Sequence, residues 1–223
     1  MRIRFKKWAR PELEASKFYI DNPKEYKGKW RELFGNDNKI HLELGCGKGY
    51  FISELAVNNK NINYIAIDMV DAMLGWAKRN IENRYDKENL KIDNIFLTRY
   101  DIERILDIIN KEDKIERIYI NFCNPWPRGK HRKKRLTHTN QLEKYKVFLD
   151  NNGEILFKTD DDSLFYDSIN YFKKSGFEIE KKTEDLEKEI DFWDKRCENI
   201  ETEHEKMFKE KGIKIKACIA KLN

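Results

Sequence analysis

Short apolar runs alternate with helix-like stretches along the chain from Lys39 onward. Most of these runs are continuously apolar rather than alternating apolar and polar, which is typical of a parallel sheet covered on both faces. The predicted strands are residues 39–44, 63–68, 94–101, 117–122, 153–160, 176–185 and 214–223. Strands that alternate with helices at this spacing predict an α/β fold with a doubly wound, mostly parallel sheet.

Between these strands, apolar residues recur at helical spacing. The predicted helices are residues 50–59, 69–84 and 201–212, and a further one in which Leu142, Tyr145, Phe148 and Leu149 recur. Thr137 precedes that last set, and threonine is a favoured residue just before the first turn of a helix.

Residues 1–37 break the pattern. They are basic and aromatic, contain Pro11 and Pro23, and show no clear period. We predict a basic N-terminal arm over residues 1–37, loosely ordered when alone, followed by one α/β domain over residues 38–223. The arm's basic block consists of Arg2, Arg4, Lys6, Lys7 and Arg10.

The composition indicates local charge rather than a generally cationic protein. Apolar residues make up 39% and charged residues 38% of 223 residues, which is enough for one buried core with a densely charged surface. The net charge is only +5 because 40 acidic residues nearly balance 45 basic ones. Basic blocks within such a chain indicate basic surface patches.

The cysteines and the amino terminus indicate the compartment. The four cysteines are far apart and form no CxxC pair, so neither a disulfide framework nor a zinc site is indicated and we expect no metal. The basic amino terminus lacks the apolar stretch of a signal peptide, and no run is long enough to span a bilayer. We expect a soluble cytoplasmic protein without a membrane partner, either a monomer or a homodimer.

A glycine turn, "ELGCGKGYF", lies where the first predicted strand meets the first predicted helix. Gly45, Gly47 and Gly49 let the backbone turn sharply and approach a ligand closely. Their GxGxG spacing differs from the GxGxxG pattern that binds a dinucleotide pyrophosphate. Glu43 before the turn would repel a pyrophosphate and suits a cationic ligand.

Two further acidic residues follow the next two strands. Asp68 ends the second strand about 20 residues after the turn, where a carboxylate receives ribose hydroxyls. Asp101 closes the third strand, in reach of an adenine amino group. Together with Glu43 and the glycines, these residues predict a site for S-adenosylmethionine. The alternative is a glycine turn made for tight packing, with acids that merely cap helices.

The stretch "NFCNPWPRGKHRKKRL" (residues 121–136) joins a rigid aromatic turn to a dense basic cluster. Pro125 and Pro127 stiffen the backbone, and Trp126 offers an apolar face for stacking on a base or for packing. The turn follows a strand, where ligands bind in open α/β sheets. A phosphate backbone would then pass along Arg128, Lys130, Arg132, Lys133 and Arg135. The alternative is a solvated basic loop after a buried tryptophan.

The blocks "ELGCGKG", "NFCNPWPRGKHRKKRL", "FKTD" and "TEHE" resemble those of the bacterial tRNA (guanine-N7)-methyltransferases. The second block is the most specific, and the resemblance extends from Lys39 to the end of the chain. It implies a seven-stranded, Rossmann-like class I methyltransferase sheet over the domain of residues 38–223. It also implies tRNA as the partner, and a guanosine of the variable loop as the target.

The resemblance also assigns individual residues. Glu43, Asp68 and Asp101 fall where family members hold the methyl donor. Asp160 in "FKTD", and Thr202 with Glu205 in "TEHE", fall where they contact the substrate. Asp160 could accept from the guanine N1 and N2 donors, and Thr202 and Glu205 could do the same or order the loop. Asn124 stands where the family usually has aspartate, and Arg128 where it usually has lysine. Because Phe122 ends a strand, residues 124–127 would form the wall beside the donor's methyl group.

The implied reaction needs no general base, because guanine N7 carries an in-plane lone pair and no proton. Positioning by Asn124 and Asp160, the predicted catalytic residues, would therefore carry most of the rate. Two other functions stay open: a nucleotide-dependent oxidoreductase on the same fold, which the GxGxG spacing disfavours, and an RNA-binding scaffold without catalysis.

Overall fold

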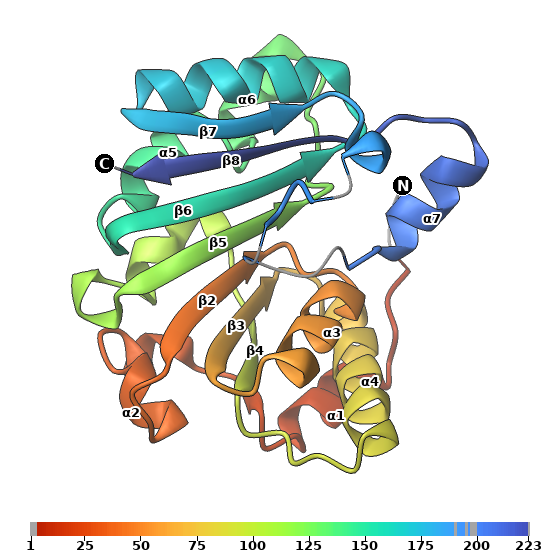
Figure 1. The fold of residues 1–223 in the computed structure, drawn as a ribbon. Helices are drawn as coiled ribbons and strands as arrows, with labels where there is room; N and C mark the ends of the chain where they lie inside the picture. Colours follow the sequence, from red (N-terminus) through yellow and green to blue (C-terminus); the bar gives the residue numbers. More distant parts are fainter. Residues whose placement is uncertain (1–3, 190, 195, 197–199, 223) are drawn as a thin grey trace. The chain divides into compact units, whose positions relative to one another are not determined.

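The computed structural model describes residues 4–189, 191–194, 196 and 200–222. The chain forms two compact units, Met1–Asp113 and Lys114–Asn223, each with strands and flanking helices (Figure 1). Both units have the α/β architecture that the sequence predicts.

Unit 1 contains a four-stranded parallel sheet in the order β1-β4-β3-β2. The strands are β1 (Tyr19–Ile20), β2 (Lys39–Leu44), β3 (Ile62–Asp68) and β4 (Ile95–Arg99). Helix α3 (Tyr50–Asn58) connects β2 to β3, and α4 (Asp71–Lys87) connects β3 to β4. Residues 40–44 and 63–67 are buried throughout, and besides apolar side chains they include the buried polar residues His41, Glu43 and Asn63.

The N-terminal region of unit 1 has more structure than its lack of period suggests. It contains α1 (Ala9–Glu14), β1, the 3₁₀ turn η1 (Pro23–Tyr26) and α2 (Trp30–Phe34). The buried carboxylate of Asp113 accepts hydrogen bonds from the backbone N–H groups of Gly28 (2.9 Å) and Trp30 (3.1 Å). Hydrogen-bond partners more than 80 positions away in the sequence hold these short elements, so no local periodicity predicts them. An arm boundary after residue 37 stays a prediction.

Unit 2 contains four strands in the order β5-β6-β8-β7. The strands are β5 (Ile115–Asn121), β6 (Leu149–Thr159), β7 (Phe177–Thr183) and β8 (Lys216–Leu222). Strands β5 and β6 are parallel, and β8 runs antiparallel to both of its neighbours, β6 and β7. The helices are α5 (Thr139–Tyr145), α6 (Asp162–Lys174) and α7 (Glu203–Glu210). Helix α6 packs against β6, β7 and β8 (Figure 1).

The 3₁₀ turns complete the elements. They are η2 (Ile102–Asp107) and η3 (Lys111–Asp113) in unit 1, and η4 (Gly129–Lys134) and η5 (Leu186–Lys188) in unit 2. No helix in the described part of the chain is long and apolar enough to cross a membrane.

The structure corrects three details of the sequence prediction. The helix predicted to include Phe148 and Leu149 ends at Tyr145, and Leu149 begins β6. The described residues form eight strands instead of seven, the additional one being the two-residue strand β1. The predicted cap Thr137 is wrong, because His138 caps α5 by accepting a hydrogen bond from the Asn140 N–H at 3.2 Å. The Thr137 hydroxyl instead lies 2.6 Å from the buried hydroxyl of Ser168 on α6.

Candidate functional site

The glycine turn of unit 1 is tied back onto β3. Gly45, Gly47 and Gly49 all adopt positive φ, at 77°, 54° and 72°. The Gly45 N–H donates to the Ile67 carbonyl at 2.8 Å. A side chain at Gly49 would lie 2.7 Å from the Cβ of Ala77, so this glycine serves close packing between helices. A Cβ at Gly47 would meet nothing within 4 Å, so there the turn leaves open space.

Two carboxylates flank this turn. Glu43 is buried in β2, and Asp68 ends β3, where its two oxygens accept from the N–H groups of Gly47 (3.0 Å) and Val70 (2.9 Å). Burial raises the pKa of Asp68, although these hydrogen bonds oppose the shift. Burial also raises the pKa of the Cys46 thiol well above its usual value, and the charges of Asp68 and Glu43 raise it further. Both carboxylates therefore act on the same small region beside the turn.

Asp101 follows β4, the next strand in the sheet. Its carboxylate caps η2 by accepting from the Glu103 N–H at 2.9 Å. The neighbouring Tyr100 N–H donates to the Asp68 carbonyl at 3.0 Å. Glu43, Asp68 and Asp101 thus lie at the carboxyl ends of three adjacent parallel strands, where open α/β sheets bind ligands. Negative charge beside open space, with acceptors for hydroxyl groups, fits a cationic donor that carries a ribose.

In unit 2 the backbone after β5 is strained. Phe122 and Trp126 have φ of 51° and 42°, in the left-handed region that bulky residues rarely adopt. The side-chain oxygen of Asn124 accepts from the Trp126 N–H at 3.1 Å, which closes a turn across Pro125. Such strained residues cost about 1–3 kcal/mol each and cluster at functional sites.

The aromatic side chains of this loop have partners within the chain. The Trp126 ring stacks on His131 with centroids 5.6 Å apart and planes inclined by 17°. The Lys134 ammonium lies 5.3 Å from the centre of the same ring. Phe122 stacks on His204 of α7 at 5.6 Å, so the end of β5 contacts the helix that contains "TEHE".

The side chains of the basic cluster differ in their exposure to solvent. Arg128, Lys130 and Lys133 are exposed on η4 and its flank. Arg132 pairs with Asp167 of α6 at 3.1 Å. Arg135 differs from its predicted role, because its side chain is fully buried and its guanidinium is bound within the protein. This geometry does not support direct phosphate contact by Arg135.

The blocks "FKTD" and "TEHE" are joined by a buried ion pair. The Lys158 ammonium on β6 lies 2.9 Å from a Glu205 carboxylate oxygen on α7, and both side chains are at most 5% exposed. The same oxygen accepts from the Thr202 N–H at 2.7 Å, while the Thr202 hydroxyl accepts from the Glu205 N–H at 3.1 Å. Thr202 and Glu205 thus form a capping box at the start of α7. Asp160, after β6, has a carboxylate with no hydrogen-bond partner among the described residues.

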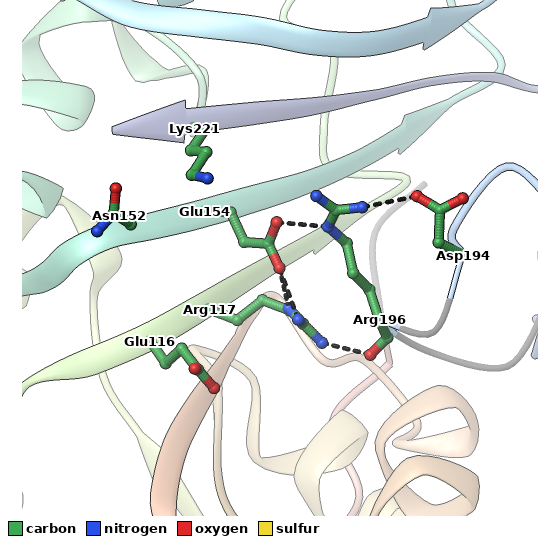
Figure 2. A pocket seen from close by; sticks show the side chains of 7 residues that line it. All are labelled: Glu116, Arg117, Asn152, Glu154, Asp194, Arg196 and Lys221. Carbon is green, nitrogen blue, oxygen red and sulfur yellow. Dashed lines mark hydrogen bonds and ion pairs between the residues drawn. The ribbon is translucent and has the colours of Figure 1, made fainter. Parts of the chain in front are cut away.

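A charged hollow on unit 2 contains residues that sequence reasoning missed (Figure 2). Its volume is about 580 Å³, and the Glu154 carboxylate pairs there with Arg117 and Arg196, at 2.6 Å each. Arg117, on β5, also donates to the Arg196 carbonyl. The guanidinium groups of Arg117 and Arg196 are bound within the protein, so the residues that line the hollow have a structural role. No sequence signal marks these partners, which are 37 and 42 positions apart.

No three His, Cys, Asp or Glu side chains gather into a metal-binding group within the described ranges. The thiols of Cys46, Cys123 and Cys218 are free, and Cys197 lies outside the described residues. Burial raises the pKa of the Cys123 thiol to about 12, so this cysteine beside the loop is an unreactive thiol at neutral pH.

Comparison with known proteins identifies the family. A family model described as a putative methyltransferase matches residues 37–218. A tRNA (guanine-N(7)-)-methyltransferase of Clostridium beijerinckii is 57% identical over 221 residues, which cover 99% of this chain and 98% of that protein. The chain belongs to this methyltransferase family. A relative with the same name from Clostridium perfringens is 54% identical over 222 residues, covering 99% of each chain.

A solved structure supports the fold. The 16S rRNA methyltransferase KamB has a TM-score of 0.63 to this chain at 12% identity, covering 87% of this chain and 93% of that one. Such a likeness shows the fold alone, which is the Rossmann-like class I methyltransferase fold. The family resemblance predicted from four short motifs is thereby confirmed over nearly the whole chain.

Proposed function

We propose that the chain transfers the methyl group of S-adenosylmethionine to N7 of a guanosine in the variable loop of tRNA. The observation that carries this function is the 57% identity, over essentially the full length, to a protein named tRNA (guanine-N(7)-)-methyltransferase. The choice of the variable loop rests on the family resemblance of the sequence motifs.

The donor is held by the acidic edge of unit 1. Asp68, oriented by two backbone N–H groups, accepts the ribose hydroxyls, and Asp101 receives the adenine amino group. The buried charge of Glu43 favours a cationic ligand over a pyrophosphate. When bound, S-adenosylmethionine supplies an electrophilic methyl group on a sulfonium. The open space at Gly47 supports this assignment, because a side chain there would reduce the room beside Asp68.

The guanine is held by residues of unit 2. The free carboxylate of Asp160 is the acceptor for the N1–H and N2–H donors of the base, while Thr202 and Glu205 act by ordering the start of α7. Asn124 holds the turn around Trp126. Since N7 carries a lone pair and no proton, none of these side chains must remove a proton, and positioning supplies most of the rate.

The tRNA backbone is bound by exposed cations of the loop. Arg128, Lys130 and Lys133 have no ion-pair partner within the described ranges and extend along the η4 segment. Each phosphate contact that such a residue makes releases counterions, so the affinity falls as salt rises.

The test is a methylation assay with labelled S-adenosylmethionine and an unmodified tRNA transcript, followed by digestion. We expect label in 7-methylguanosine. A transcript with 7-deazaguanosine at the target should bind and accept no methyl group, because a C–H group replaces the N7 lone pair. Methyl transfer to the substituted nucleotide would contradict attack by N7. Donor binding and tRNA binding without any transfer would favour the RNA-binding scaffold.

A further inference from the structure

The side chain of Arg135 is in an unusual place for a member of a basic cluster. It is fully buried, whereas Arg128, Lys130 and Lys133 of the same cluster are exposed. A buried guanidinium is tolerated only where counter-charge and hydrogen bonds compensate its lost hydration. The contacts of Arg135 therefore show what the protein uses it for.

The guanidinium makes three contacts. Its Nε donates to the backbone carbonyl of Pro125 at 2.7 Å. One terminal nitrogen donates to the Asp167 carboxylate at 2.6 Å, and the other lies 3.5 Å from the Ser163 hydroxyl. Asp167 and Ser163 both lie on α6. Arg135 thus connects a helix that is packed on the sheet to the middle of the Asn-Pro-Trp-Pro turn.

The bond to Pro125 falls at the strained part of the turn. The Pro125 carbonyl belongs to the peptide unit that precedes Trp126, whose φ is 42°. That peptide is held from both sides: Asn124 accepts from its N–H at 3.1 Å, and Arg135 donates to its carbonyl at 2.7 Å. A fixed peptide plane sets the direction in which the Trp126 side chain leaves the backbone.

Asp167 also binds a second member of the cluster. The same carboxylate oxygen lies 3.1 Å from Arg132 and 2.6 Å from Arg135. One carboxylate therefore offsets charge from two guanidinium groups. The cluster consists of an inner pair, Arg132 and Arg135, bound to α6, and an outer set, Arg128, Lys130 and Lys133, open to solvent.

We propose that Arg135 is a positioning residue that orients the Pro125–Trp126 peptide through its bond to the Pro125 carbonyl, with Asp167 as its counter-charge. The outer set then supplies the phosphate contacts. This assignment rests on the proposed methyl transfer to tRNA, and it changes the role that the sequence alone indicates for Arg135.

The decisive variant is Arg135→Lys, because lysine keeps the charge and loses the planar fork that reaches Pro125 and Asp167 together. If Arg135 bound phosphate as a charge, lysine would preserve activity. We expect instead a drop of at least tenfold in the single-turnover rate at saturating tRNA and donor, with an unchanged dependence of tRNA affinity on salt. Lys133→Gln, from the outer set, should reduce the log–log salt slope by about 0.7 to 0.9.

Arg84→Lys is the matched control. Arg84 on α4 also bridges two carboxylates, Glu54 at 2.8 Å and Glu88 at 2.7 Å, and lies outside the loop. This variant should keep the wild-type rate and salt slope. Asp167→Asn is a milder second change to the same anchor, for use if Arg135→Lys folds poorly, and it should lower the rate in the same direction.

A spectroscopic measurement tests positioning without requiring methyl transfer. Each tryptophan gives an indole N–H signal in a nitrogen-15 correlation spectrum, and Trp126→Phe identifies the signal of Trp126. Arg135→Lys should move or broaden that signal and leave those of Trp8 and Trp76 in place. An unmoved Trp126 signal, an unchanged saturating rate, or a salt slope reduced as in Lys133→Gln would each overturn the proposal. If the wild type transfers no methyl group, the proposed function fails while the spectrum still tests the positioning role.

Discussion

Replacing Lys158 by methionine should destabilise the protein strongly, because it leaves the Glu205 carboxylate buried without its ammonium partner. The two groups are 2.9 Å apart, and the side chains of Lys158 and Glu205 are 3% and 5% exposed. After the change, the hydrogen bond from the Thr202 N–H at 2.7 Å is the one that remains to that carboxylate oxygen among the described residues. Methionine matches lysine closely in length, so the change removes charge with little loss of volume.

The size of the effect follows from the burial of the pair. Removing one partner of a buried ion pair typically costs about 3–5 kcal/mol, because an uncompensated charge remains in the interior. Glutamine at position 205 retains an oxygen for the Thr202 N–H and carries no charge. The double variant Lys158→Met with Glu205→Gln should therefore recover much of the loss, as neutral replacements of buried pairs often do.

Urea denaturation of the wild type, the two single variants and the double variant measures this coupling. Lys146→Met is the control, since Lys146 and Glu143 form an exposed pair at 3.0 Å, for which about 0–1 kcal/mol is typical. Additive effects of the two single changes, or a loss in Lys158→Met no larger than that of the control, would refute this account.

Two further predictions concern the donor site and a helix cap. Asp68→Ala should weaken donor binding, measured by calorimetry, by roughly ten- to a hundredfold, because charge-assisted hydrogen bonds contribute about 1.5–3 kcal/mol. The affinity for tRNA should stay nearly unchanged. An unaltered donor affinity would contradict the assignment of Asp68 to the ribose. Burial lowers the pKa of His138, and the positive charges of Lys133 and Arg135 lower it further. The contribution of His138 to stability is therefore present above its unfolded pKa of about 6.5, and it is lost as the pH falls below that value. His138→Asn should flatten the acid-side decline in stability between about pH 7.5 and 5.5, and an equally steep decline would contradict this linkage.

The main strands were predictable because strands buried on both faces are mostly apolar, although β2 also contains the buried polar residues His41 and Glu43. Residues 39–44 were predicted as a strand and form β2 with those bounds, and the run at residues 63–68 lies within β3. Helix α6 was not predicted, although Leu164, Phe165, Ile169 and Phe172 recur at helical spacing and are buried. The sequence therefore contains the periodic signal of this helix.

The short N-terminal elements could not be predicted in the same way. Helix α2 depends on Trp30, whose indole N–H donates to the Ile108 carbonyl at 2.9 Å and whose backbone N–H donates to the Asp113 carboxylate at 3.1 Å. Both contacts join positions far apart in the sequence. A local sequence pattern does not predict a helix whose stability comes from tertiary contacts.

Candidate-site residues that lie at the ends of strands were predictable from the sequence. The burial of a side chain that depends on an ion pair with a distant residue was not. Glu43, Asp68 and Asp101 lie at carboxyl ends of adjacent strands, as their spacing indicates. Arg135 and Lys133 are both basic residues of one cluster, yet the first is buried and the second exposed. The difference lies in Asp167, which is 32 positions from Arg135 and has no marker in the sequence.

Asn124 can also be understood from its contact, although the related sequence motif usually has aspartate there. Its side-chain oxygen accepts from the Trp126 N–H, and an aspartate oxygen accepts the same bond, so the turn itself does not distinguish the two residues. What differs is charge: asparagine leaves the loop beside Arg128 and Lys130 more cationic than aspartate would. Because guanine N7 has no proton to remove, the missing carboxylate deprives the reaction of no base. We therefore expect position 124 to act through the turn that it closes around Trp126, together with the bond from Arg135 on the opposite side of the same peptide.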